Sequence, residues 1–294
     1  MITIKVPATS ANLGPGFDSL GVALQLYATF HVELSEKLRI SGCPPQYAND
    51  ENLFATAYRF RMNQLGLKPD TFNLKIESDI PLARGLGSSA VFIVAGTVAA
   101  HVLHGLDFTL PEIVDAAAQF EGHADNVAPA VYGGLCATMI VEGEVLVQRY
   151  PIHPSMHFYY IVPDFELLTH LTRVALPEKY LFADVVGSLA KVPFLLKGIE
   201  NGDQRQIDAS IQDAIHQPYR FPLIHQSEEV LAILKGFGIN SVYISGAGPT
   251  LGIIVNRPLD ERAIQAKLST LRHHFELRRL RGDDNGLEVI QENA

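Results

Sequence analysis

A glycine-rich segment at residues 81–90, Pro-Leu-Ala-Arg-Gly-Leu-Gly-Ser-Ser-Ala, has the composition of an anion-binding turn. Its glycines allow a tight turn and a close approach of the backbone to a ligand, where a Cβ would clash. Ser88 and Ser89 can cap a following helix and offer hydroxyl groups. The free N–H groups and the positive dipole end of such a helix would then face the ligand. The segment therefore predicts a phosphate site, with an ordinary capped turn as the alternative.

Other nucleotide-binding and catalytic motifs fit this chain less well. Residues 85–90 match the dinucleotide pattern Gly-x-Gly-x-x-Gly/Ala, and Asp107 lies about 20 residues further on, where a ribose-binding acid is expected. That pattern follows its strand directly, whereas residues 78–84, which include a proline, intervene here. The chain contains neither a Gly-x-x-x-x-Gly-Lys-Ser/Thr loop nor the Gly-x-Ser-x-Gly elbow of a serine hydrolase.

Two further clusters carry polar residues suited to a site. Residues 8–18 consist almost wholly of turn-forming residues, an arrangement that often shapes a binding site. Three polar residues fall within four positions beside Glu121, namely His123, Asp125 and Asn126. A helix cap or a structural histidine would explain each of them singly, but their clustering favours a functional role.

The composition is that of a soluble globular protein with two domains. The chain has 294 residues, of which 47% are hydrophobic and 19% are charged. A net charge of −9 without a basic stripe argues against nucleic acid as a partner. Two cysteines, Cys43 and Cys136, are too few for a disulfide framework and predict a reducing cytoplasm. No signal-peptide pattern occurs, and the longest apolar run, residues 90–103, is shorter than the ~18 residues needed to span a membrane.

Strands and helices must position these segments. Alternation at residues 72–77 predicts a strand before the phosphate segment, and the apolar residues 90–103 predict a buried helix that begins near Ser88. Periodicity and capping residues predict the other N-terminal elements: strands at 3–7, 25–34 and 135–141, and helices at 52–65 and 110–119. Prolines at positions 151 and 154 interrupt the pattern. The predicted domains are therefore residues 1–153 and 154–294.

The second half predicts a layer of the split βαβ type. Its predicted elements are strands at 158–162, 241–245 and 251–255, helices at 183–199, 228–237 and 260–271, and a final strand. The turn Gly246-Ala247-Gly248-Pro249 joins the two later strands, and a plain hairpin is its simplest interpretation.

Three stretches, at residues 7–21, 81–90 and 245–250, stand in the order and at the distances of the three signatures of the GHMP small-molecule kinases. The chain resembles this family over nearly its whole length. The first signature and residues 121–129 are similar to those of the branch that phosphorylates L-homoserine. The resemblance implies an α+β fold with a ribosomal-S5-like N-terminal domain and a ferredoxin-like C-terminal domain, with ATP in the cleft between them.

The resemblance also implies which residues bind the nucleotide. The implied ATP contacts are Pro81, Leu82, Ala83, Arg84, Gly85, Leu86, Gly87, Ser88, Ser89, Ala90, Gly246 and Gly248. Ser89 and Glu121 would hold Mg²⁺, because a hydroxyl and a carboxylate are hard oxygen ligands. Arg84 could neutralise phosphate charge or could be a solvated surface arginine, and Asn52 is a candidate adenine contact.

The implied reaction transfers the γ-phosphoryl group of ATP to the side-chain hydroxyl of L-homoserine, a step towards threonine, and the implied assembly is a homodimer. Arg173 and Arg220 match the arginines for the carboxylate, which a planar guanidinium can bind through two hydrogen bonds. The residues implied around the amine and the hydroxyl are Asn12, Asp18 and His123. Asp125 and Asn126 are the implied catalytic residues, and Asp125 could act as a base or only orient the hydroxyl.

Three places depart from the usual pattern of this branch: Leu168, Ala83 and the pair His225-Gln226. Leu168 replaces a small hydroxyl residue, which bears on the acceptor pocket. One alternative is therefore a GHMP kinase for another small hydroxylated acceptor. A second is a non-catalytic ATP-binding regulator on the same scaffold, and an NAD-dependent oxidoreductase is more distant.

Overall fold

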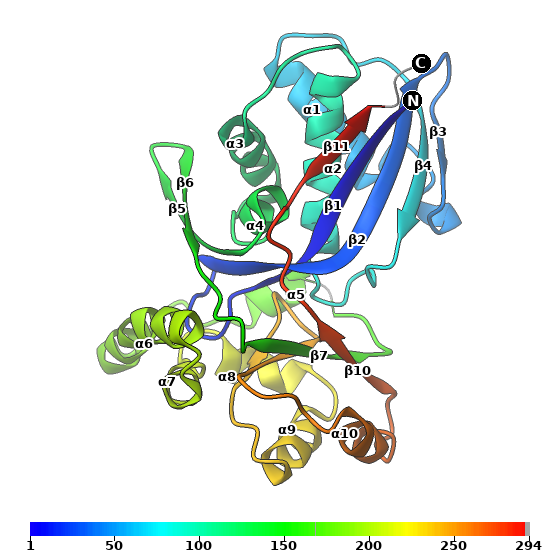
Figure 1. Cartoon of the computed structure of the whole chain (residues 1–294). Helices are drawn as coiled ribbons and strands as arrows, with labels where there is room; N and C mark the ends of the chain where they lie inside the picture. The colour runs from blue at the N-terminus through cyan, green and yellow to red at the C-terminus, as the bar shows by residue number, and fades with distance from the viewer. Residues whose placement is uncertain (168, 292–294) are drawn as a thin grey trace.

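A computed structural model describes residues 1–167 and 169–291, which form two sheets, one above the other in Figure 1. The upper sheet has the strand order β11-β1-β2-β4-β3. In addition, β5 pairs with the first residues of β2, and β6 pairs with β5. Its strands are β1 (Ile2–Ala11), β2 (Leu20–Leu34), β3 (Arg39–Ser41), β4 (Phe72–Ser78), β5 (Leu135–Val141), β6 (Glu144–Tyr150) and β11 (Glu288–Gln291). Its helices are α1 (Leu53–Gln64), α2 (Ser88–Val102), α3 (Leu110–Glu121) and α4 (Val127–Tyr132).

The lower sheet is antiparallel throughout, with the strand order β10-β7-β9-β8. Its strands are β7 (His157–Pro163), β8 (Val242–Ile244), β9 (Leu251–Val255) and β10 (Phe275–Leu280). The helices of this part are α5 (Thr169–Val174), α6 (Phe182–Asn201), α7 (Gln204–Ser210), α8 (Gln217–Arg220), α9 (Ser227–Gly236) and α10 (Glu261–Leu268). The two sheets with their helices give the expected α+β fold.

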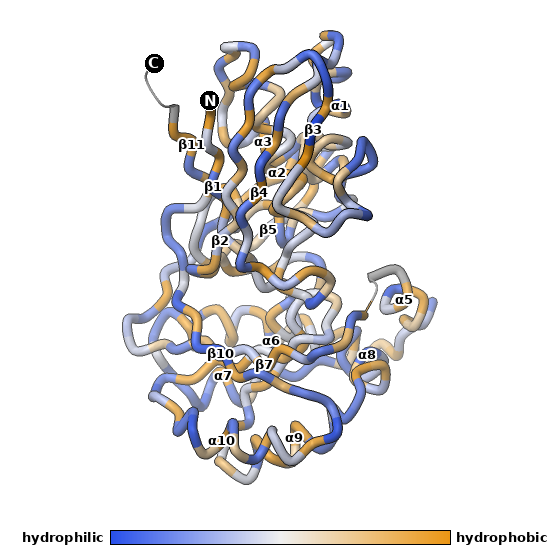
Figure 2. The backbone as a smooth tube through the Cα atoms, turned by 90° about the vertical axis from the view of Figure 1, so that its right-hand side faces the viewer, coloured by the Kyte–Doolittle hydropathy of each residue, from blue (hydrophilic) through white to orange (hydrophobic). Residues whose placement is uncertain are grey.

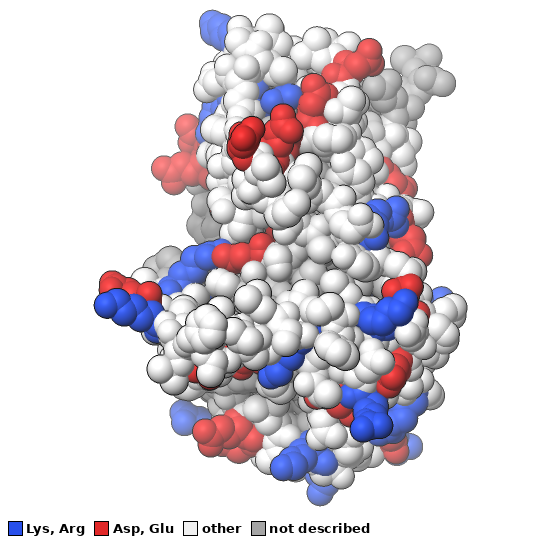
Figure 3. All heavy atoms as spheres, turned by 90° about the vertical axis from the view of Figure 1, so that its left-hand side faces the viewer, with Lys and Arg blue, Asp and Glu red and all other residues white. Residues whose placement is uncertain are grey.

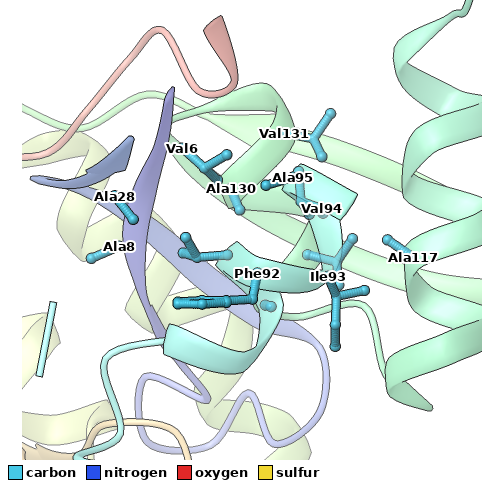
Figure 4. Close-up of a cluster of buried hydrophobic side chains, with 14 of the residues drawn as sticks. Val6, Ala8, Ala28, Phe92, Ile93, Val94, Ala95, Ala117, Ala130 and Val131 are labelled. Carbon is cyan, nitrogen blue, oxygen red and sulfur yellow. The ribbon is translucent and has the colours of Figure 1, made fainter. Parts of the chain in front are cut away.

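Helix α2 forms the centre of the N-terminal core. Every residue from Ala90 to Val102 is buried, which explains the unbroken run of alanine and valine. Figure 4 shows side chains of α2 between apolar residues of β1 and β2 on one side and residues of α3 and α4 on the other. Close packing of α2 against α1 depends on Gly96, because a Cβ there would lie 2.2 Å from the carbonyl oxygen of Phe54.

Local patterns predicted most of these elements. Helices α1, α2 and α3 and strand β5 lie where they were expected, and the Thr109 and Glu112 side chains form a capping box at α3. In β4 the apolar residues are buried in alternation with polar ones, as the hydropathy colouring of Figure 2 also shows. Figure 3 shows basic and acidic side chains interspersed over one face of the molecule. None of the helices in the described ranges has both the length and the apolar character needed to cross a membrane.

Two features of the fold differ from the expectation. Strand β1 continues past Pro7 to Ala11, because a bulge at Pro7 and Ala8 lets it follow the curved strand β2. The chain also leaves β10 and rises to β11, which pairs with β1 (Figure 1). The last described residues thus belong to the N-terminal sheet, although the predicted boundary groups 154–294 together.

Alanine substitutions at two helical glycines should change stability in opposite directions. Gly96→Ala should lower the free energy of unfolding by about 2 kcal/mol, because its Cβ would push α1 away from α2. Gly187→Ala in α6 should raise it by up to about 1 kcal/mol, since a Cβ there meets no atom within 4 Å and alanine favours the helix. Urea unfolding measures both variants, and a loss of equal size at the two sites would contradict the role of close α1–α2 packing.

Candidate active site

A cleft of about 360 Å³ lies where the two domains meet. It is lined by segments that are far apart in the sequence: the glycine-rich turn, the loop after β1, the segment between α3 and α4, helices α5 and α8, and the turn after β8. The residues of the predicted site found in its lining are Asn12, Asp18, Leu82, Ala83, Gly85, Gly87, Ser88, Ser89, Ala90, Glu121, His123, Asp125, Asn126, Arg173, Arg220, Gly246 and Gly248.

The glycine-rich turn brings the N-terminus of α2 to the cleft. Gly87 is the N-cap in the left-handed conformation, and a Cβ on it would lie 1.9 Å from the Thr9 hydroxyl. Gly85 is also left-handed, and its Cβ would lie 2.4 Å from the carbonyl oxygen of Ser245. The first N–H groups of a helix have no acceptor within the helix. At α2 they therefore open onto the cleft beside a positive helix end, which suits an anion.

Ser89 was predicted to cap α2 but does not. Its hydroxyl instead donates to Glu121 Oε2 at 2.9 Å. Glu121 ends α3, so this hydrogen bond joins two helices at the wall of the cleft. Burial raises the pKa of Glu121, and the neighbouring His123 and the Ser89 hydrogen bond oppose that effect. The pair that was predicted to hold a metal is therefore assembled, with a hydroxyl and a nearly buried carboxylate side by side.

The residues after Glu121 form a connected polar group. His123 Nδ1 lies 2.7 Å from Asp125 Oδ1, and the Asn126 amide donates to the same oxygen at 3.4 Å. Burial by itself would lower the pKa of His123, but the hydrogen bond to Asp125 and nearby carboxylates outweigh it and raise this pKa. Asn126 is the N-cap of α4 without a capping side-chain bond, and its Oδ1 accepts from the Thr9 hydroxyl at 2.8 Å. Capping is thus not what places Asn126 here.

An ion pair forms part of the lining of the cleft. Arg173 on α5 donates two hydrogen bonds to Asp18, at 2.8 and 2.9 Å. Asp18 is held in turn by Asn12, whose Oδ1 accepts from the Asp18 backbone N–H at 2.9 Å. Both Asn12 and Asp18 have positive φ, which these short polar residues tolerate better than most. The cleft therefore presents a cation and an anion in direct contact.

Arg220 is a buried cation beside this pair. It is only 2% exposed, and its donors reach the backbone oxygens of Thr172 at 3.4 Å and Gly246 at 3.2 Å. Within the described part of the chain, no carboxylate lies within 4 Å of its guanidinium. Burial, and then the charge of Arg173, lower the pKa of Arg220 to about 10. This site is thus electrostatically suited to an added anion.

The second glycine turn, at residues 246–249, closes the cleft from the other domain. Ser245 donates to the carbonyl oxygen of Gly85 at 2.6 Å and contacts the Ser10 hydroxyl at 2.7 Å. The carbonyl of Gly246 accepts from the side chains of Asn12 and Arg220. Thr9, Ser10 and Ser245 were not predicted as site residues. For Thr9 and Ser10 the signal is the pair of polar residues inside strand β1, which only a polar partner would make tolerable when buried.

Some predicted residues lie outside the lining. Leu86 is fully buried, Pro81 lies behind the turn, and Arg84 bonds the backbone oxygens of Leu82, Pro163 and Asp164 and pairs with Glu166. Arg84 thus joins the turn to the end of β7. It was expected either to neutralise phosphate charge or to be a solvated surface arginine.

The remaining candidates have structural explanations. The Asn52 side chain lines the cleft but caps α1 and bonds the Tyr47 carbonyl. Asp107 follows the C-terminal end of α2, opposite the glycine turn, which removes the support for a dinucleotide site. Ala83 adopts a positive φ of 52° where the family commonly has glycine. His225 stacks on His273, away from the cleft lining, and Leu168 lies outside the described residues.

Comparisons with known proteins agree on one family. The family models for the N-terminal and C-terminal domains of GHMP kinases match residues 52–134 and 195–273. The chain is 36% identical over 292 residues to a homoserine kinase of Clostridium botulinum (strain ATCC 19397 / Type A), covering 98% of each chain. It is 37% identical over 298 residues to that of Caldicellulosiruptor saccharolyticus, covering 99% of this chain and 97% of the relative.

Solved structures show the same relation. The crystal structure of a homoserine kinase from Cytophaga hutchinsonii superposes with a TM-score of 0.85 at 27% identity, covering 98% of this chain and 97% of that one. Mevalonate kinase from L. major shares the fold, with a TM-score of 0.70 at 14% identity over 98% and 96% of the two chains. Since the relatives match over nearly their full length, this chain belongs to the GHMP kinase family, in its homoserine kinase branch.

Proposed function

We propose that this protein transfers the γ-phosphoryl group of ATP to the side-chain hydroxyl of L-homoserine, giving O-phospho-L-homoserine for threonine synthesis. The observation that carries the proposal is the arrangement of the cleft. An anion-binding helix end stands at one side, and the Asp18–Arg173 pair with Arg220 stands at the other. The first suits a polyphosphate and the second suits the zwitterion of an amino acid. A homodimer and a cytoplasmic location stay predictions.

The triphosphate would lie along the two glycine turns. The N–H groups at the start of α2 donate to phosphate oxygens, and the helix dipole favours their negative charge. Gly85 and Gly87 let the turn pack closely enough to take this path, because a Cβ on either would clash with Ser245 or Thr9. Gly246 and Gly248 would cover the phosphates from the other domain. Their function in this scheme is to fix the γ-phosphorus in line with the acceptor oxygen.

Ser89 and Glu121 fit a magnesium ion. Mg²⁺ prefers oxygen ligands and commonly takes one or two carboxylates together with substrate phosphates. The hydroxyl and carboxylate lie 2.9 Å apart beside the helix end where phosphates would bind. When bound there, the ion would neutralise charge on the phosphate oxygens. Glu121 supplies the negative charge that retains it, and Ser89 orients one carboxylate oxygen.

The charged groups of the acceptor would replace the contact between Asp18 and Arg173. Its carboxylate binds Arg173 and Arg220, and its ammonium binds Asp18, with Asn12 and His123 completing the polar surroundings. Asp125 and Asn126 would then orient the hydroxyl towards the γ-phosphorus. The oxygen forms the new P–O bond, the bond to ADP breaks, and the hydroxyl proton passes late to an oxygen of the transferred phosphoryl group, because the transition state is loose. Orientation by Asp125, with abstraction of the proton secondary, is therefore the role we assign to it.

Release of ADP in the presence of Mg-ATP and single acceptors tests the reaction. We expect turnover with homoserine and none with serine, threonine, mevalonate or galactose, because only homoserine places an amino-acid zwitterion and a terminal hydroxyl at the required separation. Turnover with another acceptor would support kinase activity but would reject homoserine as the substrate. ATP binding without turnover of any acceptor would favour a regulator.

Arg173→Ala should raise the KM for homoserine about 30-fold and leave the KM for ATP unchanged, since it removes a charge-assisted double hydrogen bond. Aminopropanol, which is homoserine without the carboxylate, should be a poor acceptor for the wild type and no poorer for the variant. Steady-state kinetics measure both effects, and Arg262→Ala on the exposed face of α10 is the matched control. An unchanged KM for homoserine would reject the carboxylate assignment.

Glu121→Gln should lower kcat at least about 100-fold, because the amide keeps the size of the side chain and a hydrogen-bond acceptor for Ser89 but loses the charge that retains Mg²⁺. Raising the Mg²⁺ concentration should restore part of the activity. Rates over a range of Mg²⁺ concentrations measure this, with the exposed Glu229→Gln as control. If Glu121→Gln kept the wild-type rate at limiting Mg²⁺, the assignment of Glu121 as a metal ligand would be rejected.

A further inference from the structure

Phe17, in the loop after β1, lies beside both Arg173 and Arg220, although it is not among the residues that line the cleft. The guanidinium carbon of Arg220 lies 4.9 Å from the centre of its ring, and that of Arg173 lies 5.8 Å from the same centre. Both distances are within the range of attraction between a cation and the negative face of an aromatic ring. The ring is half-buried, so this attraction is only partly screened by water.

The ring of Phe17 rests on a fixed support. The imidazole of His216 stacks against it, with 5.0 Å between ring centres and 23° between ring planes. His216 is fully buried, its Nε2 donates to the carbonyl of Gly14 at 2.8 Å, and its backbone N–H is bound by Asp213 at 2.7 Å. Burial lowers the pKa of His216, and the Asp213 carboxylate, 3.4 Å from Nε2, opposes this effect. The ring of Phe17 is therefore held by a fully buried group.

Two guanidinium groups close together repel each other. Arg173 is compensated by Asp18, but the hydrogen bonds of Arg220 within the described part of the chain go to the backbone oxygens of Thr172 and Gly246. When the ammonium group of an acceptor engages Asp18, the compensation of Arg173 also weakens. An aromatic face beside both groups offsets part of this repulsion and does not compete for the acceptor carboxylate, because it offers no hydrogen-bonding atom.

We propose that Phe17 is a positioning residue of the acceptor site: its ring face holds the guanidinium groups of Arg173 and Arg220 together so that both reach one carboxylate. The proposal rests on the proposed function, since it assigns the two arginines to the acceptor carboxylate. Phe17 acts through these arginines and has no part in the phosphoryl transfer itself. Its effect should therefore be confined to binding of acceptors that carry a carboxylate.

The test replaces Phe17 by Leu, which keeps an apolar side chain of similar reach without a π system, and by Tyr, which keeps the ring. In Phe17→Leu we expect the KM for homoserine to rise about tenfold, with kcat and the KM for ATP within about twofold of the wild type. Phe17→Tyr should restore the KM for homoserine. The kinetic constants for aminopropanol should be the same in all three proteins, because that acceptor has no carboxylate.

A purely structural role gives a different pattern. If Phe17→Leu weakened the binding of homoserine, aminopropanol and ATP alike, the proposal would be overturned. Failure of Phe17→Tyr to restore the KM for homoserine would overturn it as well. Phe17→Met is a second variant of apolar character should Phe17→Leu not fold, and failure of both to fold would also reject a positioning role. Activity of the wild type separates the proposed function from this inference. No turnover of homoserine by the wild type would reject the proposed function. Normal turnover by the wild type with an unchanged KM in Phe17→Leu would reject this inference alone.

Discussion

The backbone contact between the two glycine turns is the constraint on which the rest of the site depends. Gly85, at the start of the phosphate-binding turn, lies so close to the turn after β8 that a Cβ would stand 2.4 Å from the Ser245 carbonyl. The Ser245 hydroxyl donates to the Gly85 carbonyl at 2.6 Å, and the Gly246 N–H donates to Ala11 at 3.1 Å. These contacts join the two domains through main-chain atoms and the Ser245 hydroxyl. Since they are short and directional, they fix the width of the cleft between the domains.

This contact also organises the acceptor end. The Gly246 carbonyl accepts hydrogen bonds from Asn12 and Arg220, which come from different domains. Asn12 in turn places Asp18, and Asp18 holds Arg173. The charged groups of the cleft are therefore arranged by one connected set of hydrogen bonds before any ligand arrives. The same network explains why a buried arginine without a carboxylate is tolerated, because main-chain oxygens satisfy part of its donors.

Local sequence patterns predicted the longer helices, most strands and the glycine-rich turn because their causes are local, but they missed the short helices α4, α5, α7 and α8. The apolar run of α2, the capping box at Thr109 and the glycines of the turn act over a few residues. Predictions were wrong where a distant partner decided the outcome. Ser89 does not cap α2, because its hydroxyl bonds Glu121 on another helix, and Arg84 bonds the end of β7. The partner of Arg84 cannot be identified from the residues that surround it in the chain.

The sequence by itself determined the fold class, the family and the set of residues that could act on a nucleotide and an amino acid, because these follow from periodicity, composition and motifs. Tertiary structure decided which of these residues meet. It brought Asp18 to Arg173 across 155 positions, returned the C-terminal strand to β1, and placed Phe17 beside both arginines. The physical reason is that such contacts depend on how two sheets and their helices pack, which involves the whole core and no single segment.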